Sequence, residues 1–140
     1  MTKIWSIATL ATIATMSPAL AQTQAEVEAA YSSRFNQCMG SGDAEKGVTS
    51  AILDCTGAEN KLQDARLNQA YKGVIARLAA PQQAALRKSE RDWIKRREEQ
   101  CRKAAGDVGS GSAYAIIYSS CVLDETVRRT IWLNDYPPKR

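Results

Sequence analysis

The chain has 140 residues with 19 Lys and Arg, 15 Asp and Glu, four Cys and no His. Without His, Ser-His-Asp and Cys-His catalysis and His-containing zinc sites are excluded. The length suits a single domain, and a hydrophobic fraction of 44% argues against a disordered chain.

The first 21 residues have the pattern of an export signal. Lys3 supplies a positive start, residues 4–16 carry no charge, and Ala19 to Ala21 match the small-x-small pattern that signal peptidase cleaves. The uncharged run is shorter than the roughly 20 residues that span a bilayer. We therefore expect a signal peptide at residues 1–21, cleaved near Ala21, and no transmembrane anchor. Residues 22–140 are then one helical domain of net charge +3, periplasmic or secreted.

Residues 24–39 are predicted to form the first helix of this domain, because apolar residues such as Val27, Tyr31 and Phe35 recur at helical spacing. Residues 48–79 predict a second helix, rich in good helix formers, that stops before Pro81. The apolar stripe of the second helix changes face partway along. This helix therefore either contacts different neighbours along its length or breaks near Gly57.

Residues 82–105 predict a third helix with Trp93, Arg97 and Cys101 in one stripe. A glycine-rich loop at residues 106–112 ends this helix, and residues 113–133 predict a fourth. The tail from about residue 135 is expected to be disordered. Short connections favour antiparallel neighbours, so the sequence predicts an all-α, disulfide-stapled bundle of about four helices.

All four cysteines lie in the predicted mature domain, and an even number in an exported chain indicates two disulfides. Three pairings are possible. We favour Cys38–Cys55 and Cys101–Cys121, because each pair flanks a glycine-rich turn. The spacing contains no C-x-x-C motif, which argues against a metal site and a redox site, and we expect no metal and no cofactor.

Two charged residues, Asp64 and Arg97, stand inside otherwise apolar stripes. A charge that faces a core requires a partner, so we expect Asp64 or Glu59 to pair with Arg97 between helices. The alternative is a polar site that opens on a groove.

Residues 87–103 hold eight basic and four acidic side chains. Such a segment can bind nucleic acid, anionic lipid or an acidic envelope polymer, but an exported chain is not expected to meet nucleic acid. The acids are interleaved at helical spacing, with Glu98 four residues before Arg102 and Glu99 four before Lys103. This pattern favours a solvated helix face crossed by ion pairs.

Three patterns follow one another along the chain: Asp64-x-x-Leu67-Asn68-x-x-Tyr71-x-x-Val74, Trp93-x-x-x-Arg97-x-x-x-Cys101 and Cys121-x-x-x-x-Thr126-x-x-Arg129. In this order they resemble the LprI-like lysozyme inhibitor domain family over residues 38–133. The resemblance implies a small, exported, mostly helical bacterial envelope domain that binds and inhibits lysozyme. The matched positions largely coincide with the predicted inward stripes, so they are candidates both for defining the fold and for binding. The candidate binding residues are Asp64, Asn68, Tyr71, Trp93, Arg97, Thr126 and Arg129.

The sequence thus favours a non-enzymatic exported binding protein whose partner is lysozyme or another cell-wall hydrolase. No nucleophile motif supports an enzyme, and no catalytic residue is predicted. Two alternatives stay open. One is an envelope module that binds peptidoglycan or another anionic polymer through residues 87–103, and the other is an immunity protein against a secreted cell-wall enzyme. Because common lysozymes are cationic, local acidic contacts are expected from Glu45, Glu59, Asp64, Asp124 or Glu125.

Overall fold

The structure is a computed structural model that describes residues 23–137 of the chain. Every regular element in this range is an α-helix, which confirms the predicted all-α class. The predicted signal peptide at residues 1–21 lies outside the described residues, as do residues 138–140 of the predicted tail. The helices are α1 (Gln24–Ala29), α2 (Ser33–Met39), α3 (Gly42–Glu45), α4 (Thr49–Ala76), α5 (Ala80–Gly106) and α6 (Ser112–Asn134).

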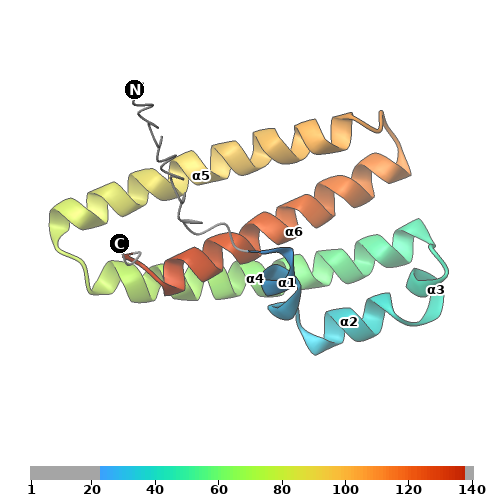
Figure 1. Cartoon of the computed structure of the whole chain (residues 1–140), viewed down its shortest axis with the longest axis horizontal. Helices are drawn as coiled ribbons and strands as arrows, with labels where there is room; N and C mark the ends of the chain where they lie inside the picture. The colour runs from blue at the N-terminus through green and yellow to red at the C-terminus, as the bar shows by residue number, and fades with distance from the viewer. Residues whose placement is uncertain (1–22, 138–140) are drawn as a thin grey trace, which may run out of the picture.

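Three long helices form the body of the molecule (Figure 1). Helices α4, α5 and α6 run in alternating directions, and α6 packs against both α4 and α5. Of the short helices, α2 and α3 pack on α4, and α1 packs on α6. The predicted disulfide-stapled bundle is confirmed, although a group of short helices replaces the first of the four predicted helices.

The segment 24–39, predicted as one helix, is divided into α1 and α2 at a turn. Ser32 forms the N-cap of α2, and its Oγ accepts a hydrogen bond from the Phe35 backbone N–H at 3.0 Å. Serine is a favoured N-cap because its side chain satisfies a backbone donor that the helix leaves open. The apolar spacing therefore identified helical structure here, while the capping serine ended one helix and began the next. Residues 42–45, which lie between the first two predicted helices, form the short helix α3.

Helix α4 is continuous through Gly57, so the predicted alternative of a break there is wrong. Its buried side chains contact different neighbours along its length, as the stripe that changes face predicted. Cys55 is bonded to α2 through a disulfide, whereas Leu67 and Val74 lie in a core shared with α5 and α6. One long helix thus connects the N-terminal group to the rest of the molecule.

The main hydrophobic core joins the three long helices. A smaller cluster attaches α1 to α6 through Val27, Leu123 and Val127, each at most 1% exposed. Full burial of one such side chain contributes about 1.5–3 kcal/mol. The main core consists of Leu67, Val74, Leu86, Trp93 and Leu133.

Both disulfides have the predicted pairing. Cys38–Cys55 connects α2 to α4, with a Cα–Cα distance of 5.8 Å, and Cys101–Cys121 connects α5 to α6, with a Cα–Cα distance of 5.5 Å. Each disulfide therefore fastens two consecutive parts of the fold across the turn between them.

A buried carboxylate, that of Glu59, attaches the N-terminal helices to α4. Its oxygens accept hydrogen bonds from the Ser32 backbone N–H at 2.9 Å, the Ser32 Oγ at 2.5 Å and the Gln63 Nε2 at 2.7 Å. Gln63 Nε2 also donates to the Ala30 carbonyl at 2.9 Å. Burial acts to raise the pKa of Glu59, but the hydrogen bonds from Ser32 and Gln63 outweigh it and hold the pKa below its ordinary 4.5.

We expect Glu59 to make the stability of the protein depend on pH in the acidic range. Its folded-state pKa is lower than its unfolded-state pKa, so the ionised group stabilises the fold above about pH 4.5. This contribution is lost as the pH falls through the folded-state pKa. Between about pH 7 and about pH 3, the melting temperature of the wild type should therefore fall more steeply than that of Glu59→Gln. The exposed control Glu45→Gln should keep the wild-type slope, and a wild-type slope in Glu59→Gln would contradict the assignment.

Candidate binding site

A groove of about 200 Å³ lies between α4 and α5. Five of the seven predicted motif positions line this groove, so residues that lie far apart in the sequence meet at one place. The other two, Thr126 and Arg129, are buried on α6 and bind groove-lining side chains. The lining residues are Asp64, Leu67, Asn68, Tyr71, Glu90, Trp93, Ile94 and Arg97.

Helix α4 contributes Asp64, Asn68 and Tyr71 to the groove. Their spacing of four and three residues places them on one helix face. Asp64 and Asn68 are exposed, and Tyr71 is half-buried against the main core. Asn68 Nδ2 donates to the Asp64 side chain at 3.0 Å and to the Asp64 carbonyl at 2.8 Å. The α4 wall therefore offers a carboxylate, an amide and a phenol, held on a regular helix.

Helix α5 contributes Arg97, whose guanidinium lies 4.8 Å from the ring centre of the buried Trp93. Arg97 Nη1 donates to Thr126 Oγ1 at 3.1 Å, and Nη2 donates to Glu98 Oε1 at 3.1 Å. Its Nε is buried and makes no hydrogen bond within the described residues. Arg97 thus joins the α5 wall of the groove to α6 behind it.

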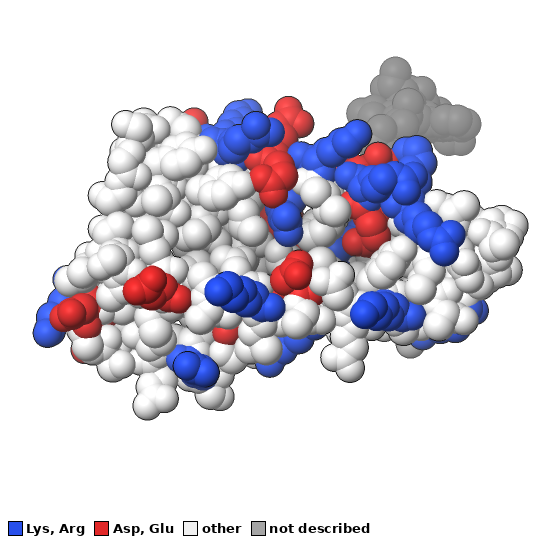
Figure 2. Space-filling view, turned by 180° about the vertical axis from the view of Figure 1, so that it is seen from behind, with Lys and Arg blue, Asp and Glu red and all other residues white. Residues whose placement is uncertain are grey.

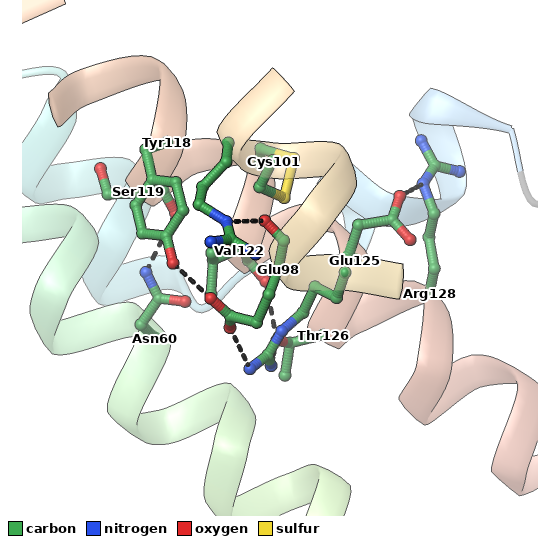
Figure 3. Close-up of a disulfide and its surroundings, with 12 residues drawn as sticks. Asn60, Glu98, Cys101, Tyr118, Ser119, Val122, Glu125, Thr126 and Arg128 are labelled. Atoms are coloured by element: carbon green, nitrogen blue, oxygen red, sulfur yellow. Dashed lines mark hydrogen bonds and ion pairs between the residues drawn. A yellow bond between two sulfur atoms is a disulfide. The ribbon is translucent and has the colours of Figure 1, made fainter. Parts of the chain in front are cut away.

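Glu98 is held between Arg97 and Tyr118. Figure 3 shows Glu98 beside Tyr118. The Tyr118 hydroxyl donates to Glu98 Oε2 at 2.6 Å. This hydrogen bond is the main reason that the pKa of Glu98 lies below 4.5, and Arg97 adds to the effect. The same bond raises the pKa of Tyr118 above 10.0. Glu98 therefore remains ionised and keeps Arg97 in place.

A second guanidinium, that of Arg129, lies behind the groove in a buried ion pair with Glu90. Arg129 Nη2 and Nε donate to Glu90 Oε1 at 2.6 and 2.9 Å, and Nη2 also donates to Ser89 Oγ at 2.7 Å. The guanidinium lies 3.8 Å from the Trp132 ring centre and 5.7 Å from that of Trp93. Trp93 thus has a cation near it from both α5 and α6.

The predicted pairing of Arg97 with Asp64 or Glu59 is wrong. Glu59 is buried against the N-terminal helices, and Asp64 is exposed at the groove. Arg97 binds Glu98 and Thr126 instead. Asp64 does not face the core because the buried stripe of α4 passes through its neighbour Gln63, which is 1% exposed.

Sequence reasoning missed two polar residues that lie against the core, the half-buried Glu90 and the buried Gln63. Glu90 lies three residues before Trp93 and seven before Arg97, a spacing that places all three on one face of α5. Gln63 lies four residues after Glu59, and the two side chains are hydrogen-bonded. A spacing of three or four residues from a buried residue was the sequence signal that could have indicated the position of both side chains.

A larger, open hollow of about 970 Å³ lies between α2, α3 and α4. Its lining includes Glu59 and both residues of the Cys38–Cys55 disulfide but none of the seven motif positions. All four cysteines are bonded in disulfides. Across residues 23–137, no group of three or more His, Cys, Asp or Glu side chains is placed to hold a metal ion. No helix in that range is long and apolar enough to cross a membrane.

The fold and the groove define a small, disulfide-bonded, all-α domain with a preformed surface groove. The family model "Lysozyme inhibitor LprI" matches residues 38–133, and the chain belongs to this family. The matched span contains the groove and both disulfides. The chain is also 29% identical over 107 residues to an uncharacterized protein of Rhizobium meliloti (strain 1021), which covers 66% of this chain and 77% of the relative. No solved structure matches the chain.

Proposed function

We propose that this protein is a non-enzymatic inhibitor that binds a lysozyme or a related cell-wall hydrolase through the groove between α4 and α5. The observation that carries the proposal is the gathering of Asp64, Asn68, Tyr71, Trp93 and Arg97, all predicted motif positions within the matched residues 38–133, around one groove. The proposal places the protein outside the cytoplasm, in the periplasm or the medium. Its two disulfides support this, because such bonds persist in oxidising compartments.

The chemistry of the groove suits a protein partner. Binding hot spots are enriched in Tyr, Trp and Arg and lie in well-packed surroundings. The groove presents Tyr71, Arg97 and the exposed apolar side chain of Ile94, which is 46% exposed. The exposed Asp64 and Asn68 add hydrogen-bonding groups beside them.

The groove is also preorganised. Its walls are regular helices, Arg97 is held by Thr126 and Glu98, and Glu90 is held by Arg129. A rigid surface loses little conformational entropy when a partner binds, and this lowers the cost of association.

Any electrostatic attraction to a cationic lysozyme has to come from acidic side chains at the contact itself. The mature chain is itself cationic, so long-range attraction is absent. Of the acidic residues predicted as contacts, Glu59 is buried, Asp124 accepts a hydrogen bond from Tyr31, and Glu125 pairs with Arg128. Glu45 is exposed on α3 but does not line the groove. Asp64 remains exposed at the groove, where it is available to a cationic partner.

Purified oxidised protein should inhibit lysozyme at near-stoichiometric amounts, measured as the hydrolysis of a soluble chito-oligosaccharide. Asp64→Lys/Asn68→Ala should weaken inhibition by at least about tenfold, because it introduces a like charge opposite a cationic partner and removes an amide. Both residues are exposed, so the melting temperature should change little.

The matched control is Asp54→Lys, which makes the same charge change at an exposed position of α4 that does not line the groove. It should inhibit as the wild type does. Equal weakening by the control would contradict the groove as the contact surface. A lack of inhibition across a range of salt would remove lysozyme as the target, and inhibition of a secreted bacterial hydrolase alone would support the immunity interpretation.

A further inference from the structure

The outer face of α5 carries a cluster of exposed cations, here called the basic face. Figure 2 shows Lys and Arg side chains gathered along the upper edge of the molecule, over α5, with acidic side chains among them. Glu99 is the one acidic residue of residues 87–103 that is classed as exposed. The basic face consists of Arg87, Lys88, Arg91, Lys95, Arg96, Arg102 and Lys103.

The other acidic residues of this segment bind inside the protein or pair locally. Glu90 binds Arg129, Glu98 binds Arg97 and Tyr118, and Asp92 pairs with Lys88 at 2.6 Å. Glu90 and Glu98 therefore leave the basic face unneutralised, whereas Asp92 neutralises Lys88.

The two ion pairs named from the spacing along α5 do not form, although Lys88 and Asp92 do pair four residues apart. Among residues 23–137, neither Glu98 with Arg102 nor Glu99 with Lys103 forms an ion pair. Arg102 Nε donates at 3.1 Å to the backbone carbonyl of Glu98 and not to its carboxylate. The carboxylate of Glu98 turns towards Tyr118 because a phenol and a guanidinium both donate to it there.

The basic face is straight and lacks large exposed apolar side chains. Positions 87, 91 and 95 follow one another at intervals of four residues, a rise of about 6 Å each, and the whole face extends over about 24 Å. The exposed apolar residue of α5, Ile94, lines the groove. The buried side of α5 packs on α6, which holds the cations on a rigid support.

These properties select among anionic partners. Membrane-bound helices insert apolar side chains, and this face offers none. Single-stranded nucleic acid is bound by stacking on aromatic side chains, which the basic face also lacks. A flexible, hydrated polymer with carboxylates along its length can instead follow a row of cations on a convex helix.

We propose that the basic face of α5 binds the carboxylate-bearing strands of peptidoglycan. The binding of a polyanion follows from the charges of the face, whereas the choice of peptidoglycan rests on the proposed function, since lysozyme cleaves that polymer. The groove and the basic face are then separate surfaces, one for the enzyme and one for its substrate.

The experiment is co-sedimentation of the oxidised protein with purified, protein-free peptidoglycan. Binding should weaken with added salt and should be lost when the peptidoglycan carboxylates are amidated. Arg87→Glu/Arg91→Glu/Lys95→Glu should bind at least about tenfold more weakly, because three attractive charges become repulsive. Its inhibition of lysozyme on the soluble chito-oligosaccharide should stay at the wild-type level, which separates a failure here from a failure of the proposed function.

Arg34→Glu/Lys61→Glu/Lys72→Glu is the matched control, since it makes the same change in net charge at exposed positions outside α5. It should retain most of the peptidoglycan binding, and a circular-dichroism melt should show both variants folded. An equal loss in both variants, or binding that survives amidation, would overturn the proposal. Stronger binding to phosphatidylglycerol vesicles or to single-stranded DNA than to peptidoglycan would overturn the choice of polymer.

Discussion

Glu90→Ala is expected to lower the free energy of unfolding by about 3–5 kcal/mol, because it leaves the Arg129 guanidinium buried without its carboxylate. The Arg129 side chain is 9% exposed and that of Glu90 is 15% exposed, so water replaces little of the lost interaction. Urea unfolding at neutral pH measures the change. The residual exposure of Glu90 favours the lower end of the range.

Two further variants test this explanation. In Glu90→Leu/Arg129→Met, apolar side chains replace the whole pair, and much of the lost stability should return because no buried charge is left unpaired. Asp92→Ala breaks the exposed pair with Lys88 on the same helix and should change stability little. If the double variant were less stable than Glu90→Ala, the unpaired charge would not be the cause.

Removing either disulfide is expected to lower the free energy of unfolding by about 3 kcal/mol. The sequence separations of 17 and 20 residues are similar, so the chain entropy released in the unfolded state is similar too. We expect Cys101→Ala/Cys121→Ala to be the more damaging, because Cys101 is fully buried and its truncation also leaves a small cavity. Urea unfolding of both double variants measures the difference.

The two disulfide variants should differ more clearly in function. Cys101 lies one helical turn after Arg97, which lines the groove, and its disulfide fastens α5 to α6. Loss of this disulfide is expected to loosen α5 and thereby the α5 wall of the groove. Cys38–Cys55 fastens α2 to α4 away from the groove, and Cys38→Ala/Cys55→Ala should inhibit lysozyme nearly as the wild type does at a temperature where it is folded. Equal loss of inhibition in both folded variants would contradict the placement of the binding surface.

Several structural features were predictable from local pattern alone. The spacing of apolar residues identified the helical segments, and the even cysteine count with its intervening turns favoured the two disulfides that the structure has. These signals are local because helix formation and the closure of a short loop depend mainly on neighbours within about 20 residues. The break at Ser32 was missed, since a capping serine also fits within a helical spacing pattern, and the short helix α3 was missed as well.

The partners of the charged side chains were not predictable in the same way. Asp64 and Gln63 are adjacent, and a rotation of 100° decides which one faces the core. Glu98 has Arg102 at the favourable spacing but binds Tyr118 of another helix. The partner of a charged side chain depends on which side chains the packed helices bring together. A spacing rule within one helix therefore cannot predict a partner on another helix.

By itself, the sequence determined the all-α class and the motif positions that resemble the family, and it favoured the disulfide pairing that the structure has. These follow from periodicity and spacing along one chain. Only the tertiary structure decided that the motif residues of α4 and α5 gather around one groove, and that Glu90 and Glu98 of α5 bind groups away from its basic face. The physical reason is that burial and pairing are set by the contact of α6 with both α4 and α5, which brings together residues far apart in the sequence.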